Sequence, residues 1–263
     1  MKKYVYIFKS ELISSLSYVF NIAFQLVGHF IHIFIFFNLW NYIYSDSTQL
    51  INGYSKNQMI WYVIVTETIW TITAGRKLCR RICNDVRGGN IAYMINKPYS
   101  YVSYIVFSHL GEQTVKTVIS FFIGVICGLA LLKEFVDISL IGIITVIIAC
   151  FLAVLISTLF ATSIGLISFI IEDANPLFWL YSKALLVLGA LFPVEFFPKT
   201  LQSVIRISPI YVICYGPARL FVDFSYKSAL IILSVQVLYV FIAWGICNLL
   251  YYKGVKKLNV NGG

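Results

Sequence analysis

Long apolar runs, each bounded by short polar segments, dominate the pattern of this chain. A helix that crosses a bilayer needs about 20 predominantly apolar residues. Six runs approach or exceed that length, and the connections between them leave no stretch for a sizeable soluble domain. The pattern therefore predicts an all-α integral membrane protein in which residues 1–263 form one transmembrane domain. The predicted spans are residues 18–44, 58–75, 104–132, 138–171, 176–192 and 228–252.

The first 17 residues have a different pattern from the runs that follow. Val5, Phe8 and Leu12 recur at helical spacing, whereas Lys9 and Ser10 fall mostly on the opposite side of the same helix. One apolar face and one polar face are typical of a helix that lies in the membrane interface. Residues 1–17 are therefore predicted to form an interfacial helix. The alternative is that they extend the first span.

The composition indicates that lipid surrounds most of the chain. Hydrophobic residues make up 60% of the sequence and charged residues 12%, with a mean hydropathy of +0.85. Soluble domains carry about twice that charged fraction. The net charge of +9 raises the question of nucleic-acid binding, but the basic residues cluster at the ends of apolar runs. That distribution follows the positive-inside rule, so we expect a lipid bilayer and no nucleic acid as a partner.

The same basic residues predict the orientation of the chain. With a cytoplasmic N-terminus, twelve lysines and arginines fall in the inside segments and six in the outside segments. The cytoplasmic side normally carries the excess. Both termini are therefore predicted to be cytoplasmic, which an even number of spans satisfies.

The most polar stretch of the chain, residues 76–103, lies between the second and third predicted spans. Arg76, Lys77, Arg80 and Arg81 occupy little more than one helical turn. Two consecutive glycines farther on permit a sharp turn, and a proline then ends any preceding helix. The order helix, turn, short amphipathic helix and stop suits a rigid element that a soluble partner pushes. It suits equally a solvated loop that binds lipid headgroups.

A second unusual segment follows the fifth predicted span. It is too apolar for an ordinary loop, yet Pro193, Pro198, Pro209 and Pro217 interrupt it too often for one spanning helix. Residues 193–226 are therefore predicted to form an extracytoplasmic re-entrant region with two short helices in the outer leaflet. Protein or water must surround such backbone, because lipid cannot satisfy it. The alternative is a surface loop with interfacial aromatic residues.

Few charges lie inside the predicted spans, and intramembrane charges are often functional. Glu67 lies in the second span, where a place on a translocation path and a packed helix contact are both open. Glu112 and Lys116 are four residues apart in the third span and are expected to pair. Small residues four apart predict close helix packing; these pairs are Gly124 with Gly128 and Ala161 with Gly165.

Sequence motifs for catalysis and metal binding are missing. The chain contains no GxxxxGK[ST] P-loop and no HExxH, GxSxG or CxxC motif. His29 and His32 share a helix face without an evident third ligand, and the six cysteines do not form two ligand pairs. We therefore expect neither a metal nor a cofactor in this chain.

Two segments make the sequence resemble a known family. Residues 85–101, DVRGGNIAYMINKPYSY, and residues 191–221, LFPVEFFPKTLQSVIRISPIYVICYGPARLF, are similar to regions of ABC-2 type permeases. The similarity is greatest to a bacterial branch of uncharacterised ABC-2 family permease components and covers nearly the whole chain. The resemblance implies six spans in the bacterial cytoplasmic membrane and an N-terminal interfacial helix. It also implies a coupling helix between spans two and three and short outer-leaflet helices between spans five and six.

The resemblance further implies partners and roles. Two permease subunits, expected to be unlike, form the pathway, and a pair of P-loop ATPases docks beneath them and holds ATP and Mg²⁺. The residues expected to couple to the ATPase are Arg80, Arg81, Asp85, Val86, Arg87, Gly88, Gly89 and Asn90. Those expected on the translocation path are Glu67, Trp70 and Thr71. Those expected at an outer gate are Pro193, Glu195 and Pro198.

The leading expectation is the permease half of an ATP-driven exporter that has no ATPase site of its own. An apolar, aromatic-rich path suits an amphipathic or hydrophobic substrate such as a drug, a peptide antibiotic or a lipid. Two alternatives stay open. An ion-coupled secondary transporter would need coupled intramembrane carboxylates. A polytopic lipid-processing enzyme would need acids, histidines or a nucleophile that converge at one interface.

Overall fold

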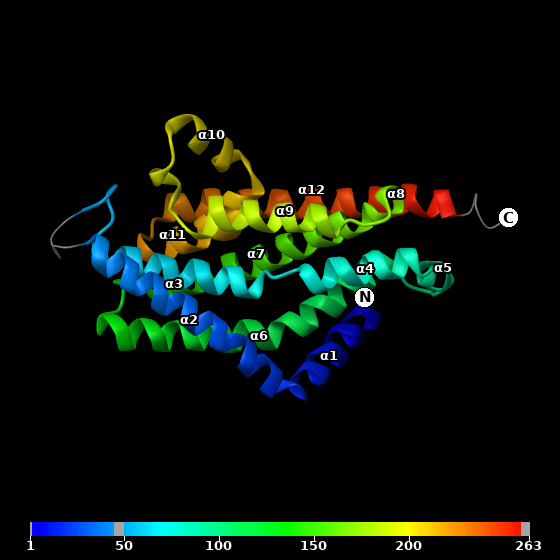
Figure 1. Cartoon of the computed structure of the whole chain (residues 1–263), viewed down its shortest axis with the longest axis horizontal. Coiled ribbons are helices and arrows are strands. Elements are labelled where there is room, and N and C mark those ends of the chain that lie inside the picture. The colour runs from blue at the N-terminus through cyan, green and yellow to red at the C-terminus, as the bar shows by residue number, and fades with distance from the viewer. Residues whose placement is uncertain (1, 45–49, 259–263) are drawn as a thin grey trace.

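The computed structural model describes residues 2–44 and 50–258, and every regular element within them is helical. The helices α3, α6, α7, α9 and α12 run roughly along the long axis of an elongated bundle (Figure 1). The first half of the chain forms α1 (Lys2–Leu16), α2 (Val19–Ile43), α3 (Lys56–Ile72), α4 (Arg76–Arg87), α5 (Asn90–Ile95) and α6 (Tyr101–Leu132). The second half forms α7 (Leu140–Leu166), α8 (Ser168–Ile171), α9 (Asn175–Leu185), η1 (Leu186–Ala190), η2 (Val194–Phe196), α10 (Lys199–Ile207), η3 (Tyr211–Tyr215), α11 (Gly216–Val222) and α12 (Tyr226–Leu258).

Four helical stretches in the described part of the chain are long and apolar enough to cross a membrane. They are Leu26–Ile43, Tyr101–Leu132, Leu140–Ile171 and Tyr226–Lys256. These stretches correspond to the first, third, fourth and sixth predicted spans and confirm an all-α membrane protein. The other two candidates are shorter, because α3 has 17 residues and α9 has 11 before it continues into the π-helical η1. Six crossings therefore remain a prediction.

Glycine makes close helix crossings possible at the predicted small-residue pairs. A Cβ atom at Gly128 of α6 would lie 2.2 Å from the Trp61 ring of α3, and one at Gly124 would lie 2.8 Å from the Thr68 hydroxyl. In α7, a Cβ atom at Gly165 would lie 2.9 Å from a side chain of α4. Such distances are too short for real Cβ atoms. Close packing of α6 on α3, and of α7 on α4, is therefore confirmed at these glycines.

The proline-rich segment between η1 and α12 forms short helices that differ in their surroundings. α10 stands apart at one edge of the bundle (Figure 1), and its Val204 and Ile207 are exposed. By contrast, η3 and α11 return into the bundle, where Val212 and Leu220 are fully buried and α11 packs against α3 and α7. This burial excludes a surface loop for Tyr211–Val222.

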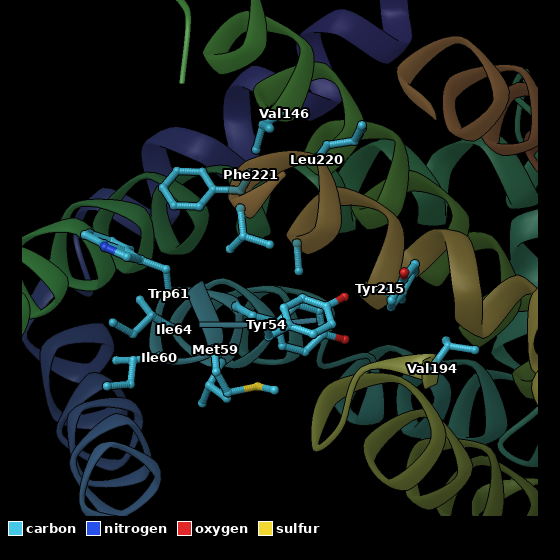
Figure 2. Packing of buried hydrophobic residues seen from close by; sticks show 14 of the residues in the cluster. Tyr54, Met59, Ile60, Trp61, Ile64, Val146, Val194, Tyr215, Leu220 and Phe221 are labelled. Carbon is cyan, nitrogen blue, oxygen red and sulfur yellow. The ribbon is translucent and has the colours of Figure 1, made fainter. Parts of the chain in front are cut away.

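The largest core cluster holds this returning segment against α3. The rings of Trp61 and Phe221 lie 5.4 Å apart, centre to centre. In Figure 2, Trp61 and Phe221 lie toward one side of the cluster, Tyr215 and Val194 toward the other, and Tyr54 between them. Aromatic contacts therefore join α3 to α11 in the returning segment.

The first helix packs along the first half of α6. The Tyr4 ring stacks on Phe107 at a centroid distance of 5.5 Å, and any side chain at Gly111 would meet the backbone of Phe8. Val5, assigned above to the apolar face, is exposed. The contact with α6 therefore uses only part of that face, and an interfacial position for residues 1–17 stays a prediction.

The most polar segment of the chain, from α4 to α5, lies toward one end of the bundle (Figure 1). α4, α5, α8 and the C-terminal end of α12 lie toward the end opposite α10 and α11 (Figure 1). The start of α1 is on the same side as α4 and α5. The segment from α4 to α5 is therefore placed beside both the N-terminal helix and the last helix.

Candidate functional site

Helix α4 presents one buried face and one exposed face. Leu78 and Ile82, four residues apart, are buried together with Cys79, and the helix packs against α7. Arg80 and Arg87 are exposed on the other side. Apolar and basic residues thus alternate at helical spacing, and this alternation fixes which side of α4 faces the bundle.

A tight turn separates α4 from α5. Gly89 adopts a left-handed backbone conformation with φ of 72°, which glycine accepts without the strain that a Cβ atom brings. In α5 Ile91 is fully buried, whereas Tyr93 is exposed. The Lys3 amine donates to the carbonyl oxygen of Pro98 beyond α5. The predicted succession of helix, glycine turn, short amphipathic helix and stop is therefore present.

Arg81 anchors α4 to its neighbours. Its guanidinium donates to the Ser108 hydroxyl at 3.1 Å and to the Tyr104 hydroxyl at 3.0 Å, both on α6. The Ser108 hydroxyl in turn donates to the Glu11 carboxylate of α1 at 2.9 Å. These polar contacts connect three helices, so a displacement of α4 acts directly on α6 and α1.

Asp85 provides a second anchor farther along α4. Its carboxylate accepts a hydrogen bond of 2.8 Å from the Tyr101 hydroxyl at the start of α6. The Tyr101 ring stacks on Tyr251 of α12 at a centroid distance of 5.7 Å. The last turns of α4 are therefore connected to both α6 and α12.

The turn between α8 and α9 lies against the same segment. Arg87 approaches the Asp173 carboxylate at 3.6 Å, and the backbone and side-chain amides of Asn175 donate to Asp173 at 2.9 and 2.6 Å. These hydrogen bonds, with a smaller effect from Arg87, lower the pKa of Asp173. The sequence analysis missed this residue. The available signal is the polar run Glu172–Asn175 between two apolar runs.

The eight residues expected to couple to an ATPase fall into two groups. Arg81, Asp85 and Val86 are partly buried and contact the bundle. We call the exposed remainder the α4–α5 outer surface, which consists of Arg80, Arg87, Gly88, Gly89 and Asn90. The eight residues thus lie together in the continuous segment from α4 to the start of α5, and five of them are exposed to solvent.

The residues expected on a translocation path lie on different sides of α3. Glu67 is buried, with its carboxylate 3.5 Å from Nδ1 of His32 on α2. The Thr71 hydroxyl lies 3.1 Å from Nδ1 of His29, also on α2. Trp70 instead lines a cavity of about 220 Å³ between α3 and α9. Glu67 and Thr71 therefore face α2, Trp70 faces α9, and the three do not share one cavity. Their place on a translocation path stays a prediction.

The expected pair of Glu112 and Lys116 does not form. Among the described residues, the nearest basic side chain to Glu112 is the buried His109, whose Nδ1 lies 4.0 Å from the carboxylate. Both spacings, three and four residues, place side chains on neighbouring positions of a helix. Sequence spacing alone therefore could not decide whether Glu112 lies closer to His109 or to Lys116.

Glu195, expected at an outer gate, lies in a polar cluster between η2 and the returning segment. Its carboxylate accepts hydrogen bonds from Tyr215 at 2.5 Å and from Tyr54 at 3.2 Å. Burial, followed by the nearby Glu195 carboxylate, raises the pKa of Tyr54 to about 12. Pro193 and Pro198 precede η2 and α10 and set where these helices begin. Glu195 therefore ties the α2–α3 connection to η3.

Within residues 2–44 and 50–258, no three or more His, Cys, Asp or Glu side chains are grouped so that they could hold a metal ion. Cys79 and Cys83 are buried on the inner face of α4. The site can thus recognise a partner by charge and shape on the α4–α5 outer surface. The contacts of Arg81 and Asp85 connect that surface to the other helices.

Apolar helices of membrane length, joined by an anchored polar helical segment at one end, define a multi-pass helical membrane protein. The sequence profile of the ABC-2 family transporter proteins matches residues 30–262, so the chain belongs to that family. It is therefore a membrane component of a transport system rather than a catalytic enzyme, and the family generally works with a P-loop ATPase. No curated protein matches the chain.

Proposed function

We propose that this chain is the permease subunit of an ATP-driven exporter and crosses the bacterial cytoplasmic membrane six times, with both termini in the cytoplasm. Family membership supports the permease role. The 17 residues of α3 are at the lower limit for a span. The uninterrupted run of α9 and η1 is of similar length, and local bilayer thinning accommodates short spans.

The single observation that carries the proposal is the two-sided character of α4 and α5. The α4–α5 outer surface is free to contact a soluble partner, while Arg81 and Asp85 connect the same element to α1, α6 and α12. A pair of P-loop ATPases that docks here and closes on ATP would move a rigid element. Its anchors would pass the displacement to the membrane helices.

The pathway is proposed to run beside α2, α3 and α9, at the interface with a second permease subunit. A different chain is proposed as that second subunit, because the branch that this sequence resembles is often encoded in unlike pairs. The walls are mainly apolar, with Glu67 and His32 among the few polar exceptions. Such walls favour an amphipathic or hydrophobic cargo over a sugar or a metal ion.

The proposal is tested by purification of the tagged chain from its native operon in a mild detergent. A P-loop ATPase is expected in stoichiometric amount with the unchanged protein. The double variant R80E/N90E changes the net charge of the α4–α5 outer surface from positive to negative and is expected to lose the ATPase. K9E alters an exposed lysine of α1, outside that surface, and is expected to retain it. A chain that purifies without any ATPase or ATP hydrolysis overturns the proposal.

One observation favours a second candidate, an ion-coupled transporter. The buried Glu67 carboxylate beside His32 is the kind of intramembrane pair that a proton-coupled carrier uses. E67Q keeps the shape of the side chain and removes its charge. Transport by an ATP-driven exporter should continue in E67Q, whereas proton-coupled transport should stop.

A further inference from the structure

We infer that the chain binds an anionic glycerophospholipid between α1 and α6, with its headgroup in a polar cavity and an acyl chain in an adjoining apolar groove. This site is separate from the α4–α5 outer surface and from the proposed pathway. It requires neither an ATPase partner nor a transported cargo. The assignment of the site to the cytoplasmic leaflet rests on the proposed function, which places both termini in the cytoplasm.

The headgroup cavity has a volume of about 510 Å³ and opens between α1, α6 and the start of α4. Arg76, Lys77 and Lys116 line it, and none of the three forms an ion pair or a side-chain hydrogen bond with another described residue. Three closely placed cations without partners favour a ligand that brings negative charge.

Two carboxylates also line this cavity, but each already has a neighbour. Glu11 accepts a hydrogen bond from Ser108, and Glu112 lies 4.0 Å from a ring nitrogen of His109. Neither carboxylate lies within ion-pair distance of Arg76, Lys77 or Lys116, and the three cations outnumber the two acids, so the cavity keeps an excess of positive charge. Basic pockets between transmembrane helices on the cytoplasmic side are typical sites for anionic lipid headgroups.

Gln113 is shared by the headgroup cavity and the groove beside it. Its side chain is 6% exposed, and its Oε1 atom is buried without a hydrogen-bond donor among the described residues. A buried acceptor without a donor is costly. A ligand that carries a hydroxyl next to its phosphate, as phosphatidylglycerol does, would supply both the missing donor and the missing negative charge.

The groove has a volume of about 310 Å³ and runs between α6 and α7. Its lining is almost entirely apolar and includes the exposed side chains Phe121, Phe122, Ile147 and Phe151. A continuous apolar groove that begins at a basic cavity has the two-part character of a phospholipid: a charged head and a hydrocarbon tail.

The depths of the two parts agree with a lipid in its normal position. Glu112 precedes Leu132, the last residue of α6, by 20 residues. At 1.5 Å per residue this separation is about 30 Å, which equals the hydrocarbon thickness of a typical bilayer. With Leu132 at the outer boundary, Glu112 lies at the level of the inner headgroups. Lys116 lies about one turn deeper, from where its long side chain reaches that level. Phe121 and Phe122 then lie among the acyl chains.

The test is native mass spectrometry of the full chain, purified in mild detergent and supplied with defined lipids. We expect the protein to retain phosphatidylglycerol in preference to phosphatidylcholine. Free glycerol 3-phosphate, which lacks the acyl chains, should not compete with phosphatidylglycerol for the site. K116Q should weaken phosphatidylglycerol retention about tenfold, the loss of one charge-assisted contact. K253Q removes an exposed charge at the same end of the bundle, outside the cavity, and should have no effect.

A second variant keeps the proposal testable if K116Q disturbs folding. T117F introduces a ring into the groove while all three cations remain, and it should also displace the lipid. Equal retention of the two phospholipids overturns the inference. So does unchanged retention in both K116Q and T117F, or equal competition by glycerol 3-phosphate. These outcomes do not depend on ATPase binding, so they are distinct from a failure of the exporter proposal.

Discussion

The Arg81 guanidinium joins α4 to α6 by donating to the Tyr104 hydroxyl at 3.0 Å, and it lies 5.5 Å from the centre of the same ring. Its neighbour Arg80 is exposed and makes no ion pair or side-chain hydrogen bond with the described residues. Two adjacent arginines therefore have different surroundings, because Arg81 holds α4 to α6 and Arg80 is open to solvent.

The first prediction compares these two arginines. R81A should lower the free energy of unfolding by about 2 kcal/mol, because two hydrogen bonds from a charged group are lost in a partly buried position. R80A should change it by less than about 0.5 kcal/mol, as is usual for an exposed side chain. Thermal unfolding in detergent measures both. Similar losses in the two variants would show that Arg81 is not an anchor.

The second prediction concerns the turn at Gly89. A Cβ atom at this position would meet nothing within 4 Å. Only the φ of 72° therefore limits which amino acids the turn accepts. Asparagine tolerates this conformation, whereas β-branched residues do not. G89V should therefore shift α5 and weaken ATPase co-purification or stimulation, while G89N should preserve it. A normal ATPase response in G89V would mean that the turn geometry is not used in coupling.

The sequence pattern predicted those parts of the fold that depend on one helix at a time. The first predicted span, residues 18–44, differs from α2 by one residue at each end. The pair Gly124 and Gly128 correctly marked a close crossing, because a missing Cβ atom is visible in the sequence. Two short helices were predicted in residues 193–226, because proline limits where a helix can continue. The structure has four short helical elements there, η2, α10, η3 and α11.

Contacts between helices could not be predicted in the same way. Glu67 lies beside His32 because of the rotation of α2 against α3, which the apolar pattern does not fix. Asp173 reaches Arg87 across a connection that appeared only as a short gap between two spans. The division of the eight residues expected to couple to an ATPase into anchors and outer surface likewise depends on the packing of α4 on α7 and on its hydrogen bonds to α6.

The third prediction tests the crossing of α6 and α3. G128A would place a Cβ atom 2.2 Å from the Trp61 ring, so the indole or the helix must shift. Overpacking of this kind costs about 1–3 kcal/mol, measurable as a lower unfolding temperature. At Gly245 in α12 a Cβ atom would meet nothing within 4 Å. G245A should therefore be neutral or slightly stabilising, and an equal loss at both glycines would contradict the close crossing.

The last prediction concerns high pH at the end of the bundle opposite α4 and α5. The pKa of Tyr54 is raised from 10.0 to about 12, first by burial and then by the Glu195 carboxylate. The folded protein therefore holds this proton more tightly than the unfolded chain does. The resulting stabilisation is complete below pH 10, the pKa in the unfolded chain, and is lost as the pH rises toward 12. It amounts to at most about 3 kcal/mol for two pKa units.

Y54F keeps the ring and removes the ionisable group, so its unfolding temperature should fall less steeply between pH 10 and pH 12 than that of the unchanged protein. Below pH 10 its curve should run parallel to the unchanged one, displaced downward because the hydrogen bond to Glu195 is missing. Y226F removes an exposed hydroxyl at the start of α12 and should leave the slope unchanged. If Y54F and Y226F follow the same curve above pH 10, Tyr54 is not buried against Glu195 in the folded protein. The polar cluster around Glu195 would then need a different arrangement.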